Sequence, residues 1–304
     1  MGTRIATRSD PDQQYDLFLP AGYPGNRLWP ALIILDPRGR TDWIMEQARR
    51  GASSNGWIVL ASYQSRSDGR EQITLTALQA LLRETGSQFA YDPKRVYIAG
   101  MSGTAKSLWI VERAMHGLVA GYIGAGGGRP PELGRLRSKV PPFFGFAGDH
   151  DFNYQEMREL DAELERIGSS HRLDIFEGAH GWPREDGQFS DALDWLELVA
   201  IRDGIAPRRR AWIEEQFVSA LARARQAKSP LESWRRLDQL VRDFAGLRTL
   251  DVEDAEVAQL RASKQVRAAL AVEAQLHAEE ARFARLLDEW ASLLKHPVTD
   301  GIRQ

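Results

Sequence analysis

The chain has 304 residues, a formal net charge of -2 and no cysteine. This length allows one large domain with an appendage or two domains, and the balanced charge argues against nucleic acid as a partner. The lack of cysteine excludes disulfide frameworks, thiolate metal sites and a cysteine nucleophile.

Short apolar runs alternate with helical patterns over the first two hundred residues. The runs predict strands at Tyr15–Leu19, Ala31–Leu35, Trp57–Ala61, Val96–Ala99, Ala120–Ile123, Phe143–Ala147 and Leu173–Phe176. Helical spacing predicts helices at Ile73–Leu82, Ala105–Met115, Tyr154–Ile167 and Phe189–Ile201. Strands that alternate with helices predict an α/β fold, with a mostly parallel sheet covered by helices on both faces.

The composition changes near residue 205. Of the 26 glycines, 24 lie at or before Gly204, and long stretches of Ala, Leu, Glu, Arg and Gln follow. A capping box with proline at the first helical position starts a helix at Ser229. Apolar stripes follow, and we interpret them as core: Trp234, Leu237, Leu240, Val241 and Phe244, then Leu276, Phe283, Leu286, Leu287, Trp290, Leu293 and Leu294. The sequence thus predicts a domain at 1–204 and an all-helical domain at 205–304.

Ser102 is the candidate nucleophile. It lies between Gly100 and Gly103, where a buried strand leads directly into an amphipathic helix. A serine on such a sharp turn projects its hydroxyl above the sheet, where it can attack a carbonyl. The same Gly-x-Ser triplet occurs at 51–53 and 168–170 without this context. The alternative role for Ser102 is a helix cap.

A serine nucleophile needs a base and an acid that orients the base. His180 follows the last predicted strand and is flanked by small residues, so it is the candidate base. His150 is its competitor, but it lies among acidic residues and precedes the acid. From their position, either Asp149 or Asp151 can be the acid, with the other one capping the loop.

These segments resemble the α/β-hydrolase superfamily, and within it the polyhydroxyalkanoate-depolymerase and feruloyl-esterase-like branch. The resemblance spans roughly residues 10–202 and rests on Tyr15–Pro20, Val96–Ala105, Pro142–Tyr154 and Phe176–Pro183. It implies the order serine, acid, histidine, and an acid in a strand-Gly-x-x-Asp pattern, which selects Asp151. Thr104 departs from the glycine or alanine that is common after such a serine.

The resemblance also implies two backbone donors for the oxyanion of an acyl-transfer reaction. One is the amide of Gly103. The other comes from the loop after the Ala31–Leu35 strand, where relatives often carry His-Gly and this chain has Asp36-Pro37-Arg38. Because proline has no N–H, Arg38 is the expected donor.

Other features carry weaker predictions. Trp182, Met101 and Tyr63 are candidate substrate contacts, with core packing as the alternative for each. The glycine run at 124–128 lacks a phosphate-binding pattern, and the cluster at 149–151 lacks further ligands, so neither cofactor nor metal is expected. The sequence predicts no membrane span, and without an apolar signal segment the compartment stays open, either cytoplasmic or exported with a signal removed.

Together these features predict a serine esterase that acts on a small-molecule or polymeric ester. Only about twenty residues separate the strands at 120 and 143, too few for a large lid, so we expect an open site. The rival functions are a serine peptidase on the same fold and a catalytically idle fold that binds a protein through its helices. We expect residues 205–304 to shape substrate access or to form an oligomer or partner surface.

Overall fold

The computed structural model describes residues 4–67, 71–185 and 187–295, without the side chains of 281, 284, 288 and 291–295. The chain divides into two compact units, Met1–Arg208 and Arg209–Gln304. None of the helices in the described ranges is long and apolar enough to cross a membrane.

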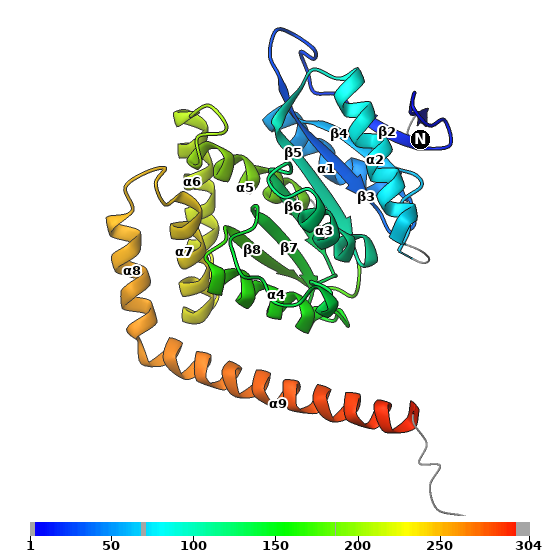
Figure 1. The fold of residues 1–304 in the computed structure, drawn as a ribbon. Coiled ribbons are helices and arrows are strands. Elements are labelled where there is room, and N and C mark those ends of the chain that lie inside the picture. Colours follow the sequence, from blue (N-terminus) through cyan, green and yellow to red (C-terminus); the bar gives the residue numbers. More distant parts are fainter. Residues whose placement is uncertain (1–3, 68–70, 186, 296–304) are drawn as a thin grey trace, which may run out of the picture. The chain divides into compact units, whose positions relative to one another are not determined.

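An eight-stranded sheet forms the centre of the first unit, in the order β1-β2-β4-β3-β5-β6-β7-β8 (Figure 1). β1 and β2 pair antiparallel to their neighbours and all other pairs are parallel. The strands are β1 Ile5–Ala6, β2 Gln14–Phe18, β3 Trp29–Leu35, β4 Ile58–Ser62, β5 Tyr91–Met101, β6 Gly121–Ala125, β7 Phe143–Gly148 and β8 His171–Phe176. This confirms the predicted α/β fold with a mostly parallel sheet.

Two apolar cores lie on the two faces of the sheet, because side chains alternate along each strand. On β3, Leu32 and Ile34 join the core that α1 and α5 cover, while Ile33 and Leu35 join the core under α2, α3 and α4. The five helices of this layered arrangement are α1 Thr41–Asn55, α2 Glu71–Gln88, α3 Gly103–Ala114, α4 Tyr154–Ile167 and α5 Gln188–Arg202. A short 3-10 helix, η1, spans Pro131–Leu133.

The second unit consists of helices in its described part. They are α6 Arg210–Arg225, α7 Pro230–Phe244, α8 Asp251–Ala262 and α9 Lys264–Lys295. α7 begins as predicted, with the Ser229 hydroxyl accepting from the Glu232 amide at 3.1 Å. Phe217 of α6 and Phe244 of α7 meet edge to face in the small apolar core of this unit.

The two predicted stripes of this unit differ in burial. Trp234, Leu237, Leu240 and Phe244 are buried, as a core stripe should be. In α9, by contrast, the side chains of the predicted stripe are 40–65% exposed, so its interpretation as core is wrong for Leu276, Phe283, Leu286, Leu287 and Trp290. The side chains of Leu293 and Leu294 lie outside the described part.

Candidate active site

Ser102 occupies the sharp turn between β5 and α3. Its backbone has φ 57° and ψ -126°, and it is the one non-glycine residue with positive φ in the part of the chain that the structure describes. Such a conformation is strained and persists only when its surroundings fix it. The Ser102 amide donates to the Ala125 carbonyl of β6 at 2.8 Å, which ties the turn to the neighbouring strand.

Close backbone packing explains two glycines around this turn. A Cβ on Gly100 would lie 2.6 Å from the carbonyl oxygen of Thr104, and one on Gly127 would lie 2.4 Å from that of Ser102. Both positions leave no room for a side chain without moving backbone. The glycines thus let β5, α3 and the loop after β6 meet at Ser102.

Thr104 helps to fix the turn between β5 and α3 through its hydroxyl. Its side chain is fully buried, and its hydroxyl accepts from the Met101 amide at 2.9 Å. The same hydroxyl is a donor within hydrogen-bond reach of the Leu35 and Met101 carbonyl oxygens. The departure from the small residue common in relatives therefore adds a polar link between the turn and the end of β3.

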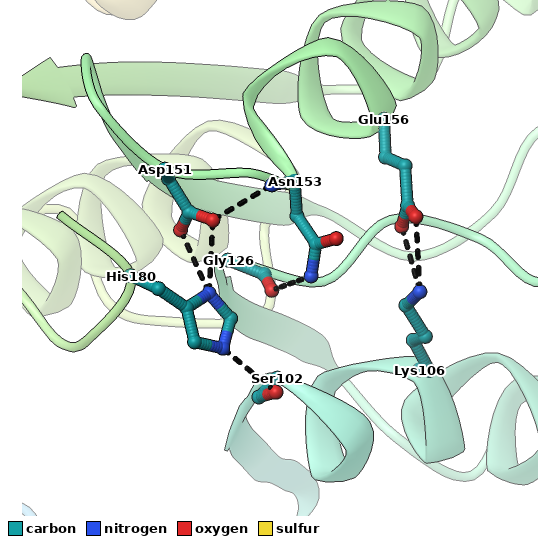
Figure 2. Close-up of polar contacts among 7 residues, drawn as sticks. All are labelled: Ser102, Lys106, Gly126, Asp151, Asn153, Glu156 and His180. Carbon is teal, nitrogen blue, oxygen red and sulfur yellow. Dashed lines mark hydrogen bonds and ion pairs between the residues drawn. The ribbon is translucent and has the colours of Figure 1, made fainter. Parts of the chain in front are cut away.

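Figure 2 shows Ser102, His180 and Asp151 in a continuous hydrogen-bonded chain. The Ser102 Oγ lies 2.8 Å from His180 Nε2, and His180 Nδ1 lies 2.9 and 3.0 Å from the two Asp151 carboxylate oxygens. The three residues follow β5, β7 and β8 at the carboxyl edge of the sheet, the edge where open α/β sheets bind their ligands. The Asp151 side chain is buried and that of His180 is 20% exposed.

An ionised carboxylate can only accept hydrogen bonds, and this fixes the roles of the two ring nitrogens. When Asp151 is ionised, the shared hydrogen resides on His180 Nδ1. The Nε2 lone pair is then free to accept from the Ser102 hydroxyl. This is the arrangement in which the imidazole can remove the hydroxyl proton.

Asp149 lies near these three residues but binds other groups. Its carboxylate accepts from the Gly178 amide at 2.9 Å and lies 2.8 Å from His150 Nδ1. The Gly178 hydrogen bond, assisted by His150, lowers the pKa of Asp149 below its usual value. Asp149 therefore links the loop after β7 to the loop that carries His180.

Asn153 helps to hold the Asp151 carboxylate in place. Its amide donates to Asp151 Oδ1 and its side-chain Nδ2 donates to the Gly126 carbonyl, both at 2.8 Å (Figure 2). Above it, Glu156 of α4 forms an ion pair with Lys106 of α3 at 2.8 Å. These contacts join the acid loop to the helix that begins beside Ser102.

The two expected oxyanion donors differ in their surroundings. Gly103 is the first residue of α3, where amides have no partner within the helix. The Arg38 amide, by contrast, donates to Asp36 Oδ1 at 2.9 Å, as the Arg40 amide does at 3.0 Å. In this conformation the single backbone amide hydrogen of Arg38 is already bonded to Asp36. The role of Arg38 as second oxyanion donor stays a prediction.

The three candidate substrate contacts are placed in different ways. Trp182 is buried in the core, and its indole N–H donates to Asp36 Oδ2 at 3.0 Å. Met101 is partly buried against the same core. Tyr63 is 9% exposed, under the guanidinium of Arg4. No contact with a substrate follows from these positions, so the three assignments remain predictions.

Phe152 lies beside His180 and was not among the candidate residues predicted from the sequence. Its side chain is 78% exposed, yet its ring centroid lies 4.2 Å from that of His180. An aromatic residue directly after the predicted acid is the sequence signal that could have identified it. The ring gives the triad an apolar neighbour on the solvent side.

No protein-family model and no curated protein sequence matches this chain. Solved structures do match. A thermophilic esterase, Est2, from Thermogutta terrifontis has a TM-score of 0.54 at 13% identity, over 68% of this chain and 96% of its own. Est1E from Butyrivibrio proteoclasticus has a TM-score of 0.53 at 15% identity, over 66% and 99%. The fluorophosphonate-binding serine hydrolase FphF of Staphylococcus aureus has a TM-score of 0.51 at 14% identity, over 64% and 97%.

The likeness to these proteins and the order of the sheet define the fold of this chain as that of the α/β-hydrolases. The structures it resembles are those of esterases and serine hydrolases.

Proposed function

We propose that this protein is a serine esterase with Ser102 as nucleophile, His180 as base and Asp151 as the acid that orients the base. The proposal rests above all on the hydrogen-bonded chain from Ser102 through His180 to Asp151. All three residues lie in the first unit, and we assign catalysis to this unit. The structures of esterases that the chain resembles support the same function.

In the first half of the reaction, Ser102 Oγ attacks the ester carbonyl while His180 Nε2 takes the hydroxyl proton. A tetrahedral intermediate forms, and its oxyanion accepts a hydrogen bond from the Gly103 amide at the amino end of α3, where the helix dipole also favours negative charge. His180 then gives the proton to the leaving alkoxide, which leaves an acyl group on Ser102.

In the second half, water attacks the acyl-enzyme and loses a proton to His180, which returns it to Ser102 as the acid product leaves. Asp151 stabilises the imidazolium that forms in both halves. The Arg38 amide can act as a second oxyanion donor once it exchanges its bond to Asp36 for one to the oxyanion.

The test is turnover of a short p-nitrophenyl ester by the wild type and by Ser102→Ala and His180→Ala. Each substitution is expected to reduce kcat by about 10⁴–10⁶-fold, since members of such a triad act together. Ser53→Ala is the matched control, because Ser53 belongs to another Gly-x-Ser triplet and lies on the exposed side of α1. It should keep wild-type turnover.

Two further measurements separate the rivals. A fluorophosphonate should label the wild type on Ser102, while an idle fold would stay unlabelled. Turnover of a p-nitroanilide with the same acyl group measures the peptidase alternative. A wild-type rate in Ser102→Ala, or a higher kcat/KM for the anilide than for the ester, would contradict the proposal.

A further inference from the structure

The exposed stripe of α9 has the spacing of a coiled coil. Leu276, Phe283 and Trp290 are seven residues apart and occupy the first core position of successive heptads. Val272 and Leu286 occupy the second core position of the same repeat. All five side chains are 40–65% exposed. A sustained seven-residue apolar repeat is typical of helices that pack against a partner helix.

The beginning of α9 is already covered by its own unit. Val266 is fully buried, and Glu273 forms an ion pair with Arg235 of α7. The exposed stripe starts at Val272, next to this ion pair, and continues toward the end of the helix. From Val272 to Trp290 the helix rises by roughly 27 Å at 1.5 Å per residue. Along this part of α9 the apolar side chains form an exposed face of a kind that monomeric proteins rarely have.

We propose that this face binds the same face of a second copy of the chain, with the two α9 helices antiparallel. In an antiparallel pair, first and second core positions face each other. Phe283 then packs against the partner's Leu286, and Leu286 against the partner's Phe283.

Charge complementarity selects this register. Arg282 and Glu289 both occupy the heptad position that flanks the core, and neither forms an ion pair among the described residues. In the antiparallel register above, Arg282 faces the partner's Glu289 and Glu289 faces the partner's Arg282. A shift by one heptad would bring two Arg282 or two Glu289 side chains together instead. Opposite charges at such flanking positions set partner choice and orientation in coiled coils.

Glu279 excludes the parallel alternative by the same argument. It occupies a core position of the heptad, between Leu276 and Phe283. In a parallel pair the two Glu279 carboxylates would face each other inside the interface, where like charges are costly. The antiparallel pair places each Glu279 against the partner's Trp290 and keeps the two carboxylates apart.

The experiment is light scattering coupled to size exclusion on the full chain and on charge variants. The wild type should be dimeric, while Arg282→Glu and Glu289→Arg should each dimerise about tenfold or more weakly, because each turns two attractive pairs into repulsive ones. The double variant, Arg282→Glu with Glu289→Arg, should recover the dimer. An equimolar mixture of the two single variants should form heterodimers.

Phe283→Asp removes the apolar contact and should give a monomer. Because the chain has no cysteine, Val272→Cys reports orientation: oxidation should not cross-link the antiparallel dimer, whereas a parallel dimer would cross-link at once. A monomeric wild type, a dimer that the charge variants leave unchanged, or cross-linking of Val272→Cys would overturn the proposal. Circular dichroism of each variant checks that the helices are retained.

Discussion

At the residue scale, Thr104 shows how a side chain outside the proposed triad holds Ser102 in place. The Ser102 backbone is strained. The buried Thr104 hydroxyl accepts a hydrogen bond from the amide of Met101, the residue directly before Ser102. Thr104→Val keeps the side-chain shape but leaves this amide without its partner. We expect a loss of about 1–3 kcal/mol in the free energy of unfolding, the usual cost of a buried unsatisfied donor.

Activity distinguishes this role from general packing. If the hydroxyl positions Ser102, Thr104→Val should lower kcat while KM changes little. Ser107→Ala is the control, because it removes a buried hydroxyl of α3 that bonds only within its own helix. Equal losses of kcat in the two variants would mean that Thr104 has no special role at the turn. Urea unfolding and ester turnover measure both quantities.

Asp149 makes a prediction about pH. The Gly178 amide and His150 lower the pKa of Asp149, so its ionised form stabilises the folded state. This contribution is present above the usual aspartate pKa of about 3.9 and is lost as the pH falls through the lowered value. Asp149→Ala should therefore lower the melting temperature at neutral pH, and the difference from the wild type should vanish in strong acid.

The measurement is the melting temperature of both proteins across the acidic range. Asp12→Ala serves as control, since Asp12 is an exposed aspartate at the surface, and it should track the wild type at every pH. A difference for Asp149→Ala that stays constant from neutral to strongly acidic pH would contradict the assignment of this link to the ionised carboxylate.

At the scale of elements, a buried ion pair joins the central strand β5 to α5. Arg95 is paired with Glu197, and the indole of Trp57 donates to the same carboxylate at 3.1 Å. Glu197→Ala leaves the guanidinium in the interior with fewer acceptors. It should reduce the free energy of unfolding of the first unit by about 3–5 kcal/mol.

The double variant, Arg95→Met with Glu197→Leu, is the control for this pair. Two apolar side chains of similar volume remove both charges, so this variant should be more stable than Glu197→Ala alone. Chemical denaturation followed by tryptophan fluorescence reports the change, because Trp57 contacts the pair. A double variant less stable than the single one would show that the charges themselves stabilise the fold.

Sequence periodicity could predict most elements of the first unit, since buried parallel strands read as apolar runs. It missed the helix α1, the two-residue strand β1, and the start of β5 at Tyr91, where Asp92, Pro93 and Lys94 look like a turn. The order of the strands and the exposure of the α9 stripe depend on contacts far apart in the chain. Periodicity alone contains no such information.

The juxtaposition of Ser102, Asp151 and His180 could be predicted for a different reason. Ser102, Asp151 and His180 stand in turns after apolar strands, and the topology of a parallel sheet brings such turns to one edge. The link through Asp149, the Arg38 amide bond to Asp36 and the ring of Phe152 over His180 are contacts of side chains with backbone or with each other. Spacing along the sequence does not determine contacts of this kind.

At the scale of the whole molecule, the proposed triad and all the hydrogen-bond partners described for it lie in the first unit. A chain that ends at Arg208 should therefore keep its turnover of a short ester, provided that circular dichroism shows it to be folded. Ser102→Ala in the same shortened chain gives the background rate. A folded but inactive fragment would show that residues 209–304 contribute to catalysis.

The position of β8 at the edge of the sheet has a consequence for inactivation. Ser102 follows β5, an interior strand with neighbours on both sides, whereas His180 follows β8, which pairs with β7 alone. Edge strands open locally at lower free energy than the strands they flank. His180, the proposed base, is therefore expected to separate from Ser102 while the rest of the sheet stays intact. We therefore expect gentle warming to reduce ester turnover reversibly, through fraying of β8, below the temperature at which the whole sheet melts.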